Sequence, residues 1–145
     1  MGLLIDYFTA PSDDDAAAAL ETGPGDRFPA TDGTRIEPVV TLGKLEELLT
    51  GKTFEQRLSD PASHPLIASA HDDSVVVVKL ADSFVQALAD AGKPRLDALA
   101  VPWSQIEELG GMADPAALAD FLYRLQDLAE TAVGEGSAIY CRIRL

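Results

Sequence analysis

The sequence predicts an α+β fold in which residues 1–145 form one domain around a small mixed sheet. Three observations lead to this prediction: a β-prone run at the N-terminus, two apolar runs around a polar turn in the middle, and a long amphipathic helix followed by a C-terminal strand. Their order, with helical patterns between them, indicates about four strands and five or six helices. A chain of 145 residues is long enough for one hydrophobic core and short for two.

The C-terminal helix is the most clearly marked element. Asp114 is suited to cap its N-terminus and Pro115 to occupy its first position, where the N–H that proline lacks would have no helical partner. Apolar residues then recur at i, i+3, i+4 spacing: Leu118, Phe121, Leu122, Leu125, Leu128, Ala129 and Ala132. Gly134 and Gly136 are expected to end the helix.

Beyond Gly136 the side chains alternate, which predicts a strand because successive strand residues point to opposite faces. The apolar set is Ile139, Cys141, Ile143 and Leu145, and the polar set is Tyr140, Arg142 and Arg144. We expect Cys141 to be a buried structural cysteine. The polar set is interpreted as a covered outer face of the sheet or as partners of nearby carboxylates, with an exposed aromatic and cationic patch as the alternative.

The N-terminal third contains the next predicted elements. Residues 3–8 are β-prone and are expected to form an interior strand. Ser12 and Asp15 have the spacing of a capping box, so a first helix is expected from there to about Glu21. Residues 26–35, which include Pro29 and Gly33, are interpreted as an irregular loop, with Phe28 as an anchor beneath it.

The middle of the chain predicts a second helix from Pro38 to a stop at Gly51, with Glu46 and Glu47 facing outward. Thr53 and Gln56 form another capping-box pair, which predicts a short helix ending before residue 61.

Residues 66–70 and 74–80 are predicted to form a hairpin, with His71, Asp72 and Asp73 as its turn. Asp82 is suited to cap the helix that follows, which Gly92 is expected to close. Residues 96–101 predict a short helix or turn before Pro102, and Trp103 begins another short amphipathic piece.

Several short motifs resemble the YfbM-like family of small bacterial proteins of unknown function. They are Met1-Gly2 leading to Tyr7-Phe8, then Leu48-Leu49-Thr50-Gly51, Pro65-Leu66 and Phe121-Leu122. The bias toward Ala, Asp, Gly and Pro is similar to a divergent, actinobacterial-type branch. This resemblance implies a fold and carries no established activity.

Charge and hydropathy exclude several classes of protein. The formal net charge of −13 would repel a phosphate backbone, so no nucleic acid partner is expected. No apolar run approaches the ~20 residues that span a bilayer, so no membrane partner is expected. A single cysteine and the lack of a visible secretory signal favour the cytoplasm. The acidity is interpreted mainly as an ordinary solvated surface, with a basic protein partner as the alternative.

No catalytic residue, metal site or cofactor is predicted. The chain lacks a G-x-S-x-G motif, a phosphate-binding loop and a dinucleotide fingerprint. Two isolated histidines do not form a metal signature. Adjacent acids such as Glu46 and Glu47 point about 100° apart on a helix and cannot share one substrate.

The candidate binding residues are Tyr7, Trp103, Tyr140, Arg142 and Arg144, because tyrosine and tryptophan are enriched at binding hot spots. We expect a non-enzymatic protein-binding module, immunity-like or regulatory. The alternative is a small-molecule-binding protein or enzyme with a pocket near Tyr7, Trp103 and Tyr140. A homodimer formed through a strand edge or the Trp103 segment is a third possibility.

Overall fold

The structure is a computed structural model, and it describes residues 4–23, 25, 28–33, 36, 38, 40–51, 53, 55–56, 65–111 and 113–144. Five strands in this part of the chain form one sheet: β1 (Leu4–Ala10), β2 (Ala30–Asp32), β3 (Leu66–Ala70), β4 (Val75–Lys79) and β5 (Ala138–Arg144). Their order is β2-β1-β5-β4-β3, and every pair is antiparallel. The described sheet is therefore antiparallel and not mixed, which corrects that part of the prediction, and it has five strands where about four were expected.

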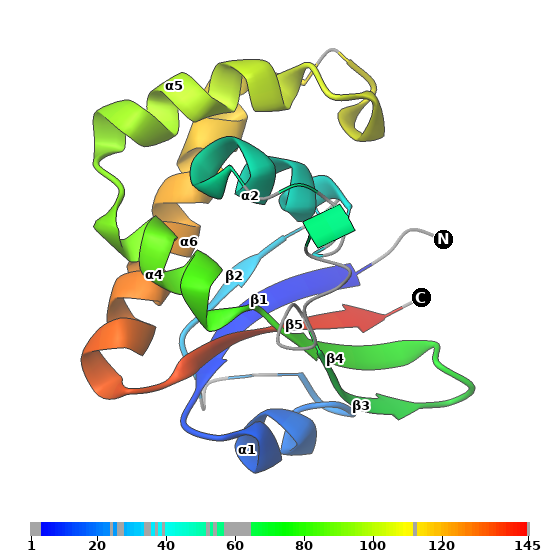
Figure 1. The fold of residues 1–145 in the computed structure, drawn as a ribbon. Helices are drawn as coiled ribbons and strands as arrows, with labels where there is room; N and C mark the ends of the chain where they lie inside the picture. Colours follow the sequence, from blue (N-terminus) through cyan, green and yellow to red (C-terminus); the bar gives the residue numbers. More distant parts are fainter. Residues whose placement is uncertain are drawn as a thin grey trace.

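Helices cover both faces of this sheet (Figure 1). The helices are α1 (Asp13–Ala18), α2 (Thr41–Thr50), α4 (Asp82–Asp90), α5 (Lys93–Ser104) and α6 (Pro115–Glu135), with one 3₁₀ turn, η1 (Glu107–Leu109). Helices α2, α4, α5 and α6 lie on one side of the sheet and α1 lies on the other. The α+β class and the predicted number of helices are confirmed. No helix in the described ranges is long and apolar enough to cross a membrane.

Helix α6 begins where its capping signal predicts. The Asp114 carboxylate accepts a hydrogen bond from the Ala116 N–H at 3.1 Å, and Pro115 is the first helical residue. The helix ends at Gly136, whose φ of 68° lies in the left-handed region that glycine enters without steric cost. Gly134 lies inside the helix, so of the two predicted glycines only Gly136 ends it.

The face of α6 that the spacing predicts is the centre of the main core. Residues from Leu118 to Ala132 pack there with side chains of α2, α4, α5, β1 and β5. The ring of Phe121 contacts Tyr7 and Trp103, with centroid distances of 5.7 and 6.3 Å. This core therefore joins the first strand, the fifth helix and the last helix, which lie far apart in the sequence.

A smaller second core fills the other side of the sheet, beneath α1. Phe8 and Tyr140 stack there at 5.8 Å, and Phe28 stacks on Phe8 at 6.0 Å. The predicted role of Phe28 as an anchor agrees with this contact. Ala16 and Ala19 contribute the apolar surface of α1 and of the turn after it.

Strand β2 lies within the stretch that the sequence indicated as an irregular loop, which corrects that prediction. Its three residues pair with β1, with Thr31 opposite Tyr7. The Gly33 N–H then donates to the Ile5 carbonyl at 2.8 Å. A Cβ on Gly33 would lie 2.3 Å from Cε2 of Tyr7, so glycine is required for this close approach of backbone to ring.

Replacing Gly33 by alanine is expected to lower the free energy of unfolding by about 2 kcal/mol, because the Tyr7 ring must move from a packed position. Urea unfolding followed by the fluorescence of Trp103 measures this. Gly134→Ala is the matched control, since nothing lies within 4 Å of a Cβ built there. That control is expected to stabilise the protein by up to about 1 kcal/mol. Equal effects of the two changes would contradict the assignment.

Other element boundaries differ from the predictions for local reasons. Helix α1 ends at Ala18, and turns continue the chain to the predicted end at Glu21. Helix α2 begins at Thr41 instead of Pro38. Helix α5 continues through Pro102, where the sequence predicted a break. Pro102 lies near the C-terminal end of the helix, and the packing of the next residue, Trp103, which is fully buried, holds that last turn in place.

Glu46 corrects a second prediction, since its side chain is buried and only 2% exposed. It lies four residues after Leu42 on α2, and that spacing places it at the edge of the buried face. Adjacent Glu47 is half-buried.

The central hairpin is confirmed, with Ala70 opposite Val75. His71, Asp72 and Asp73 all have positive φ, at 55°, 55° and 66°. Asparagine, aspartate and histidine are the side chains that enter this region most often after glycine.

The Thr53 and Gln56 capping box is also present. Each backbone N–H donates to the other residue's side chain, at 2.9 and 3.2 Å. The predicted end of that helix before residue 61 lies outside the described residues.

Candidate functional site

The structure separates the five predicted binding residues onto two faces of the sheet. Tyr7 is paired in register with Cys141, and both belong to the main core together with Trp103. Tyr140 belongs to the smaller core beneath α1. A pocket shared by Tyr7, Trp103 and Tyr140 is therefore not formed, which corrects the alternative hypothesis that placed one there.

Tyr7 and Trp103 are fully buried, and their polar atoms bond to the backbone. The Tyr7 hydroxyl donates to the Ile36 carbonyl at 2.5 Å, and Trp103 Nε1 donates to the Thr41 carbonyl at 2.9 Å. Buried aromatic residues with satisfied polar atoms contribute to stability. Neither side chain is exposed at the surface, and the homodimer stays a prediction. Cys141 is buried, as predicted.

Tyr140 links β5 to α1 through a hydrogen bond. Its hydroxyl donates to the Asp13 carboxylate at 2.6 Å, and Lys79 Nζ lies 3.5 Å from the same oxygen. Burial, followed by the Asp13 hydrogen bond, raises the pKa of Tyr140 well above its usual range. The same hydrogen bond, with a smaller contribution from Lys79, lowers the pKa of Asp13. At neutral pH the tyrosine stays protonated and donating, so it cannot act as a base.

Arg142 makes a second link, to the turn that follows α1. Its Nε donates to the Leu20 carbonyl at 2.7 Å and its Nη2 to the Glu21 carbonyl at 3.0 Å. The residue is 7% exposed. The outer face of β5 is thus covered at Tyr140 and Arg142, as the favoured interpretation of the polar set expected, and Arg144 alone of the set is exposed.

Asp6 lies beside Arg142 on one side and Asp32 on the other, in register across three strands. Its pKa is raised, first by burial and then by Asp32, while Arg142 acts in the opposite direction. Because the pKa of Asp6 is higher in the folded protein, the fold favours the protonated carboxyl group. The stability that this protonated group contributes is complete below pH 3.8, the ordinary pKa of aspartate, and is lost as the pH rises through the folded-state pKa.

Asp6→Asn is therefore expected to raise the free energy of unfolding at pH 7, by less than about 1 kcal/mol because this half-buried group is screened by solvent. The gain is expected to disappear below pH 3.8. Urea unfolding at several pH values measures it. A gain that persists at acidic pH would show that the carboxylate charge is not the cause.

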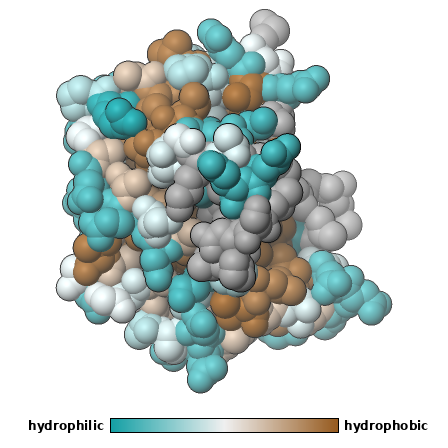
Figure 2. Space-filling model, viewed as in Figure 1, coloured by the Kyte–Doolittle hydropathy of each residue, from teal (hydrophilic) through white to brown (hydrophobic). Residues whose placement is uncertain are grey.

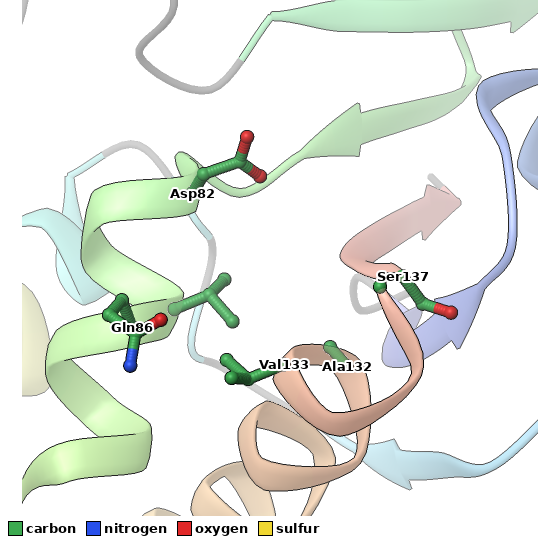
Figure 3. A pocket seen from close by; sticks show the side chains of 7 residues that line it. Asp82, Gln86, Ala132, Val133 and Ser137 are labelled. Carbon is green, nitrogen blue, oxygen red and sulfur yellow. The ribbon is translucent and has the colours of Figure 1, made fainter.

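An open hollow lies between α4 and the junction of α6 with β5 (Figure 3). Its volume is about 240 Å³. The lining residues are Asp82, Val85, Gln86, Ala132, Val133, Gly136 and Ser137. Asp82 and Gln86 lie on α4, and Ala132, Val133 and Ser137 lie across the hollow on α6 and just after it, with the Ser137 hydroxyl directed away from α4. Sequence reasoning missed this site, and its one local signal is Val133, an apolar residue that is 44% exposed on α6.

Three groups around this hollow are hydrogen-bond acceptors or negatively charged. The Asp82 carboxylate is exposed at its rim. Gln86 Nε2 donates to both carboxylate oxygens of Asp90 at 3.1 Å, which leaves the amide oxygen of Gln86 to accept. The C-terminal end of α6 adds the negative end of a 21-residue helix, and its last turn contains no basic side chain.

Comparisons of this chain with protein-family models, with curated proteins and with solved structures found no match. The resemblance to the YfbM-like family therefore stays a prediction.

The chemistry of the hollow favours binding a cation. Its apolar part is formed by Val85 and Val133, and its polar part accepts hydrogen bonds. Among the described residues no three His, Cys, Asp or Glu side chains lie close enough to hold a metal ion.

Proposed function

We propose that this chain is a non-enzymatic protein-binding module whose partner presents a basic surface. The observation that supports the proposal is the distribution of charge: carboxylates face solvent while most of the described cations contact groups of the chain itself. The formal net charge is −13. An excess of this size produces a negative potential around the molecule and attracts a basic protein from a distance.

The acidic side chains are spread over the surface. Sixteen Asp and Glu residues in the described part of the chain are exposed, on α1, the central hairpin, α4, α5 and α6 among other segments. Figure 2 shows hydrophilic residues distributed across the viewed face instead of gathered in one place. A partner can therefore be steered toward the chain from several directions before a specific contact forms.

At least five of the seven Lys and Arg side chains in this part have intramolecular contacts. Arg142 bonds to the Leu20 and Glu21 carbonyls. Arg124 contacts Asp120 at 3.3 Å and Thr31 at 2.6 Å. The other three are Lys79 near Asp13, Lys93 over the Tyr123 ring, and Arg95 at the Leu49 carbonyl. The described Lys and Arg side chains therefore act mainly in local contacts, and the net charge exposed to solvent is negative.

We further propose that the module acts in a bacterial cytoplasm, in an immunity-like or regulatory role that masks its partner. A single buried cysteine agrees with a reducing compartment. An acidic single-domain protein is suited to cover a basic functional surface, because charge complementarity gives both a fast association rate and specificity.

Affinity capture from a lysate of the producing cells, followed by mass spectrometry, tests this function. We expect a specific partner with a basic surface that is retained at low salt and released at high salt, because salt screens contacts between exposed charges. Recovery of no specific protein under gentle conditions, or of an acidic partner unaffected by salt, would contradict the proposal.

A further inference from the structure

We propose that the hollow between α4 and the end of α6 receives a lysine side chain of the partner. This inference rests on the proposed function and names the contact at which its specificity arises. The hollow combines an apolar wall, several acceptors and a helix end of negative potential, and each of these features matches one part of a lysine side chain.

The apolar wall matches the lysine stem. Val133 is 44% exposed, an unusual position for a branched apolar residue on a helix that otherwise directs such residues to the core. Val85 and Ala132 line the same hollow but are buried in the core, at 3% and 0% exposed, so Val133 supplies most of the accessible apolar surface. Four methylene groups laid against Val133 would remove apolar surface of both partners from water.

The acceptors match the ammonium group. Asp82 lies at one rim with its carboxylate exposed, and the Gln86 amide is held by Asp90 with its oxygen left as an acceptor. The last turn of α6 adds the negative end of the helix dipole. The Gly136 and Ser137 N–H groups both donate to the Ala132 carbonyl, and of the three residues after Ala132, whose carbonyls lack helical partners, Val133 lines the hollow.

The arrangement of these acceptors favours lysine over arginine. The Asp82 carboxylate alone matches a guanidinium group, but the Gln86 amide oxygen and the negative end of α6 lie in other directions, so the full set of acceptors is not one planar pair. An ammonium group has three donors that rotate about its last bond, so it can bond to acceptors in different directions. Helix dipole and carboxylate both favour the charged form of the lysine.

A titration of the ¹⁵N-labelled full-length protein with three dodecapeptides tests the inference. The peptides contain six lysines, six arginines or six norleucines, alternating with glycine. With the lysine peptide we expect the largest amide shift changes at Val85, Val133, Gly136 and Ser137, weaker binding of the arginine peptide, and none of the norleucine peptide. Equal or tighter binding of the arginine peptide would overturn the choice of lysine.

Two variants locate the contact. Asp82→Asn is expected to lower the affinity for the lysine peptide about three- to fivefold, which is the effect of losing an ion pair at a partly exposed site. Val133→Ser is expected to weaken it by a similar factor through the lost apolar contact. Asp127→Asn removes the same charge from an exposed position elsewhere on α6, and is expected to change the affinity by less than about 1.5-fold.

The outcomes separate the two proposals. One outcome is that the lysine peptide binds but changes amide shifts elsewhere, and that Asp82→Asn and Asp127→Asn alter the affinity equally. In that case the lysine site is wrong, while the proposal of an acidic binding module stands. If the lysine peptide fails to bind at low salt, both are contradicted. Unchanged spectra of the three variants outside the altered region show that each variant is folded.

Discussion

Replacing Trp103 by alanine is expected to lower the free energy of unfolding by about 3–5 kcal/mol, the largest effect of any change considered. The side chain is fully buried and packs against Phe121, which in turn contacts Tyr7. Its removal leaves a cavity at the point where α5, α6 and the sheet meet. Urea unfolding followed by far-ultraviolet circular dichroism measures the change.

Trp103→Phe separates the packing contribution from the hydrogen bond. Phenylalanine retains most of the ring contact with Phe121 but cannot donate to the Thr41 carbonyl, which lies 2.9 Å from Nε1. We expect a loss of about 1–2 kcal/mol, clearly smaller than for alanine. A loss below about 0.5 kcal/mol for Trp103→Ala would show that this residue is not part of the core.

Arg142→Met is expected to lower the free energy of unfolding by about 2–4 kcal/mol. The change removes charge-assisted hydrogen bonds to the Leu20 and Glu21 carbonyls while keeping much of the apolar stem. It also removes the cation beside Asp6, whose other neighbour in register is Asp32. Hydrogen exchange of the α1 amides is expected to accelerate more than exchange in α6, because Arg142 holds the chain just after α1.

Arg144→Met is the matched control for this change. Arg144 lies two residues further along β5 and is exposed, so its loss is expected to alter stability by less than about 0.5 kcal/mol. Asp6→Asn in the Arg142→Met background is expected to recover part of the lost stability. Identical effects of the two arginine changes would contradict the role assigned to Arg142.

Long periodic elements with strong end signals could be predicted from the sequence. The capping residue Asp114, the proline after it and the spacing from Leu118 to Ala132 predict α6, and the structure confirms its start and its buried face. Alternation predicts β5 in the same way, including the burial of Cys141. In both cases large apolar side chains recur on one face, so the period of the helix or strand can be recognised in the sequence.

Features that depend on tertiary contacts could not be predicted from the sequence. Strand β2 has three residues, and its pairing with β1 depends on the close approach of Gly33 to Tyr7. The capping box predicts the start of helix α1, but not its end or its buried face, because the alanines that cover the sheet give little hydrophobic periodicity. Burial of Glu46 depends on its position at the edge of the α2 face, while its charge predicts exposure.

The hollow could not be predicted from the sequence. Aromatic and cationic residues suggested binding at Tyr7, Trp103, Tyr140 and Arg142, and the structure buries all four. The hollow is formed by α4 and the end of α6, about 50 residues apart in the sequence, and its residues belong to no local motif. Only the folded chain brings Asp82 near Val133 and the C-terminal end of α6, whose last turn has no basic side chain.

The most direct test of the central claim is the salt dependence of binding to the lysine dodecapeptide, measured by fluorescence anisotropy with a labelled peptide. We expect binding at low ionic strength that weakens at least about tenfold between 0.01 and 0.1 M salt, as the screening length falls from about 30 to 10 Å. The norleucine peptide should show no binding. No binding of the lysine peptide at 0.01 M salt, or an affinity independent of salt, would contradict the account.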